Sequence, residues 1–200
     1  MAIRRFSTSN LSGSKSSKLW DQETTPGTFE SIATVIVPSA GAANISFTNI
    51  PQNYAHLQIR LIGRGTGGSG GNVQCFIYFN GITGTTNYSD HVLRGDGSSA
   101  TAGGDISQSG LYIDRVPSSS DTANVFGALV IDILDYTSAV KNKTTKTLGG
   151  YDANGSGKIT LSSGEWFASP TAVTSLTIGL DGSQTFVQNS QAALYGIRGA

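Results

Sequence analysis

The acidic side chains of this sequence could support acid–base chemistry, but their spacing completes no catalytic pair. Asp132 and Asp135 are three residues apart, and on a strand their side chains would point to opposite faces. Glu165 precedes Trp166, a combination that suggests a carbohydrate site. Cleavage of a glycosidic bond needs a second acid, and the sequence assigns none to this position. We therefore predict no paired-carboxylate active site.

The histidines and the cysteine also lack catalytic partners. A Ser-His-acid triad would have to use His56 or His91, and neither lies near a nucleophile-elbow motif. We expect both histidines at surface or edge positions. Cys75 is the single cysteine, so no intrachain disulfide can form. Its place in NVQCFIYFN predicts a small buried hydrophobe on a strand.

Two motifs that resemble ligand sites are better interpreted as turns. DANGSGKIT, from Asp152, opens like a calcium loop, but Ser163 occupies the position where the loop needs its closing Glu. Asn154-Gly155 instead predicts a hairpin turn. The RGD triplet at 94–96 continues into Asp96-Gly97, which also predicts a turn between two strands. We predict no metal site and no adhesion motif.

The glycine-rich and lysine-rich segments likewise predict no phosphate or nucleic-acid site. GRGTGGSGG lacks the Gly-Lys-Ser/Thr ending and the following helix that bind phosphate. Lys141, Lys143 and Lys146 form a small basic patch, which we interpret as the solvated face of a hairpin. The chain has zero net charge, no signal-peptide core and no apolar run of membrane length. We expect no cofactor, no nucleic acid and no membrane as partners.

The elements that must position these residues are strands. Charged residues make up only 13% of the chain and 26 residues are Gly, which is typical of all-β proteins with many turns. The apolar run at 124–136 favours a central strand over a short helix, because Val130, Ile131 and Ile133 are β-branched. Alternating or β-rich segments occur at 31–38, 43–50, 55–63, 73–81, 88–99, 109–116, 124–136, 144–152, 157–167, 172–183 and 191–199. We predict a single antiparallel β-sandwich, jelly-roll-like, over residues 30–200.

Residues 1–29 have a different composition and are predicted to form an extended N-terminal arm. Its four basic residues precede the first acid, Asp21; they are Arg4, Arg5, Lys15 and Lys18. Two interpretations stay open: a solvated chain end, or an arm that becomes ordered on an acidic partner. In the second, the basic residues pair with the partner, and Phe6 and Trp20 are apolar anchors.

Several stretches taken together carry a resemblance to a known group. They are ESIATVIV, ISFTNIPQNYAHLQIRLIGR, VIDILDYTSAVKNKTTKTLGGYDANG and the terminal LYGIRG. This set resembles small proteins encoded in the structural modules of tailed bacteriophages. The resemblance covers residues 30–200 and implies a non-enzymatic accessory virion protein, either head decoration (cement) or a tail fibre or tail-tip part. It carries over no functional residues.

Three functional hypotheses follow from these observations. The first is a capsid decoration protein, a homotrimer docked on capsid proteins through its arm, located in the virion and assembled in the bacterial host cytoplasm. The second is a tail fibre or tail-tip component whose exposed loops at 63–72 and 94–104 bind host-surface glycan. The third is a carbohydrate-binding or carbohydrate-active module centred on Glu165 and Trp166.

Overall fold

The structure is a computed structural model and describes residues 28–67, 69–84, 86–168 and 170–199. Within these residues the regular elements are twelve strands and a short 3-10 turn at Ser69–Gly71. No helix of the described residues is long and apolar enough to cross a membrane. The strands are β1 (Phe29–Ile36), β2 (Asn44–Phe47), β3 (His56–Gly63), β4 (Asn72–Phe79), β5 (Tyr88–Gly95), β6 (Ala100–Gln108), β7 (Leu111–Pro117), β8 (Gly127–Leu134), β9 (Lys143–Asp152), β10 (Gly157–Trp166), β11 (Leu176–Leu180) and β12 (Gln191–Ile197).

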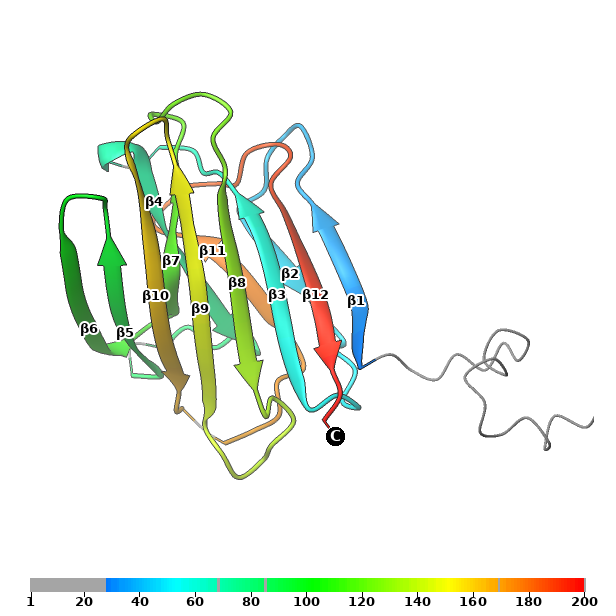
Figure 1. Cartoon of the computed structure of the whole chain (residues 1–200). Helices are drawn as coiled ribbons and strands as arrows, with labels where there is room; N and C mark the ends of the chain where they lie inside the picture. Colours follow the sequence, from blue (N-terminus) through cyan, green and yellow to red (C-terminus); the bar gives the residue numbers. More distant parts are fainter. Residues whose placement is uncertain (1–27, 68, 85, 169, 200) are drawn as a thin grey trace, which may run out of the picture.

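The strands form two sheets of unequal size that pack face to face. The large sheet has the order β1-β12-β3-β8-β9-β10-β5-β6, and the small sheet has the order β2-β11-β4-β7. Neighbouring strands pair antiparallel throughout both sheets. Figure 1 shows the small sheet behind the large one, with β5 and β6 at one end of the large sheet and β1 at the other. The predicted all-β class and antiparallel sandwich are confirmed.

The alternation read from the sequence decides which side chains enter the core. In β8, Leu129, Ile131 and Ile133 are buried, while Val130 and the other alternate positions turn outward. This strand lies between β3 and β9, as expected for a central strand. Cys75 is fully buried in β4, which confirms its prediction as a small core residue. Burial raises the pKa of its thiol well above the ordinary value.

The two ends of the described chain lie side by side at the β1 edge. Phe29 pairs with Ile197, and the Arg198 amide donates to the Thr28 carbonyl at 3.0 Å. Figure 1 shows the C-terminus beside the start of β1. Residues 1–27 join the sandwich at this point and lie outside the described residues. The predicted docking residues are all among them; they are Arg4, Arg5, Phe6, Lys15, Lys18 and Trp20.

The segment at 94–104 is not the exposed loop that we expected. It contains the end of β5, a turn, and the first half of β6. The turn itself is confirmed: Asp96 accepts hydrogen bonds from the Ser98 and Ser99 amides, and Gly97 has a φ of 90°. β6 was missed because ATAGGDISQ has no apolar alternation, and from Ala100 to Ser107 it is exposed on both faces.

Candidate functional site

Glu165 and Trp166 lie on opposite sides of the large sheet and cannot form one carbohydrate site. Trp166 is 1% exposed and stacks on Phe79 in the core, with 5.4 Å between ring centroids. Its ring therefore has no free face for a sugar. Glu165 points outward, where Asn142 donates to its Oε1 at 2.9 Å. This placement corrects the centre that we predicted for the third hypothesis.

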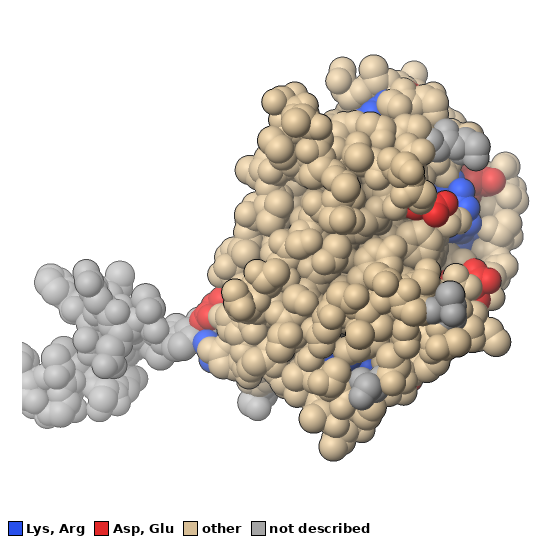
Figure 2. All heavy atoms as spheres, turned by 180° about the vertical axis from the view of Figure 1, so that it is seen from behind, with Lys and Arg blue, Asp and Glu red and all other residues tan. Residues whose placement is uncertain are grey.

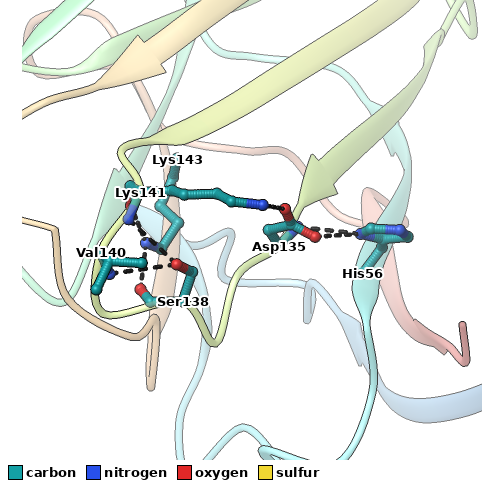
Figure 3. A network of polar contacts seen from close by, with 6 residues as sticks. All are labelled: His56, Asp135, Ser138, Val140, Lys141 and Lys143. Carbon is teal, nitrogen blue, oxygen red and sulfur yellow. Dashed lines mark hydrogen bonds and ion pairs between the residues drawn. The ribbon is translucent and has the colours of Figure 1, made fainter.

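His56 contacts the acidic residue Asp135, but the two residues are not arranged as in a catalytic triad. The Asp135 amide donates to His56 Nδ1 at 3.0 Å, and the Asp135 carboxylate holds Lys141 Nζ at 2.6 Å (Figure 3). A triad would need the imidazole between a nucleophile and the acid. Here the acid lies between His56 and Lys141, and the Ser138 hydroxyl accepts the amides of Val140 and Lys141.

The three lysines do not share a solvated hairpin face, so that prediction is wrong. Lys143 is fully buried and its ammonium donates to the carbonyls of Ser138 and Lys141, each at 2.6 Å. Burial lowers the pKa of Lys143. Lys146 lies three strand positions beyond Lys143 and is exposed on the outer side of the sheet. Lys143 therefore holds the connection between β8 and β9 instead of adding to a basic surface.

The motifs interpreted as turns have the expected local geometry. Asn154 and Gly155 have φ values of 62° and 97°, and Asp152 accepts the Gly155 amide at 3.1 Å. Arg94 of the RGD triplet donates to the Tyr112 hydroxyl at 2.5 Å and is tied to the fold. Among the described residues, no group of three or more His, Cys, Asp and Glu is placed to hold a metal ion.

The most extensive candidate site is the outer side of the large sheet, which no other element of the described chain covers. We call this side the open face. Four directly paired residues on four neighbouring strands form an apolar row across it; they are Leu93 (β5), Leu161 (β10), Leu148 (β9) and Val130 (β8). Their exposed fractions are 54%, 53%, 54% and 38%. Adjacent strands are about 4.8 Å apart, so the apolar row spans roughly 14 Å.

Further apolar residues and a hollow extend the apolar row. A second row lies two residues further along the strands of the open face. It contains Ile159 (63% exposed) on β10, Ala128 on β8 and Ile62 on β3. Leu93 and Leu161 also line a shallow hollow of about 380 Å³, together with the outward side chains of His91, Lys146 and Ser163. The open face is thus apolar at its centre and polar along one side.

On the side of β3, the apolar row ends at a group of polar and aromatic contacts. Arg60 pairs with Val130 across the strands, and its guanidinium carbon lies 5.5 Å from the ring centroids of both Phe29 and Tyr195. These two rings stack on each other with 4.7 Å between centroids. The side chains on this part of the open face are therefore held in place by cation–π and stacking contacts.

The open face presents an exposed apolar row beside a shallow hollow. Monomeric soluble proteins seldom expose a contiguous apolar patch unless it contacts a partner. The sequence contains part of the signal, because each of these four strands has at least one large apolar residue at an outward position. It was missed because we interpreted the apolar run at 124–136 only as a central strand and did not ask what covers its outer side. Comparison with known proteins finds no matching family model and no matching curated protein.

Proposed function

We propose that this chain is a non-enzymatic structural protein of a tailed-bacteriophage virion, displayed on the particle as capsid decoration. The observation that carries the proposal is the apolar row on the open face. An uncovered apolar surface on a rigid sheet suits contact with a neighbouring subunit, because covering it removes apolar area from water at about 25 cal/mol per Å². The resemblance of residues 30–200 to accessory virion proteins supports the virion setting.

In this proposal the open face seats on a subunit of the capsid. Two of its charged groups already have contacts within the face: Gln58 donates to Asp132 at 2.9 Å, and Arg60 packs on two rings. A partner surface therefore needs mainly apolar complementarity at the apolar row. Residues 1–29 would add a second attachment, and two linked contacts hold far better than one. A homotrimer remains the proposed assembly, to be measured by sedimentation of the isolated protein.

Introducing charge on the open face tests the proposed contact. Leu148→Lys with Leu161→Lys places two ammonium groups in the apolar row, where covering them would require their desolvation. We expect binding to decoration-free particles of the same phage, measured by co-sedimentation, to fall by about tenfold or more. Val140→Lys is the matched control, because Val140 is 85% exposed in the β8–β9 connection and outside the open face. Equal binding of the double variant and wild type would refute the role of the open face.

Location on the virion tests the function itself. Antibody against residues 28–199 should place gold over the head of intact particles of the phage that encodes the chain. Gold confined to the tail would replace decoration with a tail fibre or tail-tip role. Intact particles without label, when the same antibody detects the isolated protein, would overturn the virion proposal.

A further inference from the structure

A polar cleft lies where the β5–β6 hairpin reaches past the β7 edge of the small sheet. Inward residues of β5 and β6 line one wall, and outward residues of β4 and β7 line the other. The cleft has a volume of about 180 Å³. Figure 2 shows most of the visible charged atoms around a hollowed region at the end of the molecule where Figure 1 places β5 and β6. Its side chains include Gln74, Phe76, Asp90, Arg94, Asp105, Gln108, Tyr112 and Arg115.

Three buried polar atoms of the cleft have no hydrogen-bond partner in the protein. They are Oδ2 of Asp90, Nε of Arg94 and Nε of Arg115. Asp90 is only 3% exposed, so its free oxygen is a buried acceptor on the cleft wall. Buried polar groups are nearly always paired in native proteins, so each unpaired one calls for an explanation such as a functional role or a bound water or ion. The residues that line the cleft thus carry one unpaired acceptor and two unpaired donors.

The remaining polar atoms are held in position by the fold. Arg94 donates through a terminal nitrogen to the Tyr112 hydroxyl at 2.5 Å, which leaves its Nε unused. Arg115 donates through a terminal nitrogen to Asn72 Oδ1 at 3.0 Å, again leaving Nε unused. Both guanidinium groups are therefore oriented before any ligand arrives, and pre-orientation lowers the entropy cost of binding.

We propose that this cleft binds one uncharged sugar ring of a carbohydrate. A sugar hydroxyl both donates and accepts, so neighbouring hydroxyls can donate to Asp90 and accept from Arg94 and Arg115. Phe76 and Tyr112 pack edge to face, with centroids 5.9 Å apart, and add ring surface for the apolar side of a sugar. Apolar surface with a few placed polar groups is the usual composition of a small-molecule site.

The charges of the cleft argue against an ionic ligand. An anion would meet the carboxylates of Asp90 and Asp105, which face each other across neighbouring strands. A metal cation would meet the guanidinium groups of Arg94 and Arg115. The volume is below the roughly 300–1,000 Å³ of sites for drug-sized ligands, which restricts the occupant to about one ring. This inference does not depend on where the protein sits in a particle.

Titration followed by NMR tests the inference on the full chain. The ¹⁵N-labelled protein is titrated with D-glucose, D-galactose, D-mannose and N-acetyl-D-glucosamine to about 50 mM, since a single ring with few contacts binds in roughly the millimolar range. Calcium chloride and sodium acetate serve as ionic probes. We expect at least one sugar to shift the amide signals of Asp90, Arg94 and Arg115 with a saturable profile. We expect neither calcium nor acetate to produce such shifts.

Two variants connect the binding to the cleft. Asp105 also lines the cleft, where its exposed carboxylate can accept from a further sugar hydroxyl. Asp105→Ala removes this acceptor without opening the core, and we expect it to weaken the sugar titration by about tenfold. Asp132→Ala is the control, because Asp132 lies on the opposite side of the same sheet. Shifts by an ion alone, no saturable shift with any of the four sugars, or equal sugar binding by Asp105→Ala and wild type would each overturn the inference.

Discussion

Asp90 on β5 and Asp105 on β6 lie directly opposite each other, and both line the polar cleft. Like charges in this cross-strand position repel. Burial, and secondly the Asp105 charge, raise the pKa of Asp90 to about 6. An arrangement that lowers stability while leaving polar atoms unpaired is more typical of a binding site than of a structural wall.

Replacing Asp90 by Asn should stabilise the protein at high pH. The folded pKa of about 6 exceeds the ordinary value of 3.8, so the native state binds more protons between these values, and stability falls as pH rises through them. Asp90→Asn removes this loss. We expect urea unfolding to show a gain of about 3 kcal/mol at pH 8 and little change at pH 3.

Asp96 supplies a control of opposite sign for the Asp90 experiment. Hydrogen bonds from Ser98 and Ser99 lower the pKa of Asp96, so its stabilising effect is present at neutral pH and is lost in acid. Asp96→Asn should therefore destabilise the protein at pH 8. If Asp90→Asn also lost stability at pH 8, it would contradict our inference that the ionised Asp90 carboxylate destabilises the fold.

Gly196→Ala should destabilise the packing of β12. A Cβ at Gly196 would collide with the ring of Tyr54, whose hydroxyl donates to Glu30 Oε2 at 2.7 Å. Overpacking of this kind costs about 1–3 kcal/mol, measurable as a lower urea midpoint. Gly103→Ala is the matched control, since its Cβ would meet only Val92 Cγ1 at 3.6 Å. Equal midpoints for the two variants would show that Tyr54 moves aside without cost.

Lys143→Met should destabilise the β8–β9 connection although it removes a buried charge. The methionine leaves the Ser138 and Lys141 carbonyls without the ammonium donor, and an unsatisfied buried group costs about 1–3 kcal/mol. Lys146→Met is the control at an exposed position, expected within about 0.5 kcal/mol of wild type. Thermal unfolding of both variants checks the difference; a Tm for Lys143→Met equal to that of the control would rule out the proposed support.

Cys75 should be unreactive in the native protein. Its side chain has no exposed surface, and the raised pKa keeps the thiol protonated. Ellman's reagent should therefore label Cys75 only after denaturant is added, at the rate set by unfolding. Rapid labelling of the folded protein would mean that β4 opens locally, which its place between β11 and β7 does not predict.

Much of the fold could be predicted from the sequence because strand alternation is local. Ile45 and Phe47 in β2, and the alternate apolar residues of β3 and β8, were recognised from the identity of their neighbours alone. The turns at Asp96-Gly97 and Asn154-Gly155 were also predictable, since they depend on backbone conformations that few residue types adopt. Each of these features depends on two to eight consecutive residues.

The candidate surfaces depended on pairings that no local pattern contains. Leu93 joins Leu161 and Leu148 only because β5 pairs with β10 and β10 with β9 in one register. Asp90 lines the same cleft as Arg115 only because the β5–β6 hairpin reaches past the edge of β7. A local pattern determines on which side of its strand a side chain lies. Long-range hydrogen bonding between backbones determines which strand is its neighbour and which residue of that strand lies opposite. Only the tertiary structure therefore decided where the apolar row and the polar cleft lie.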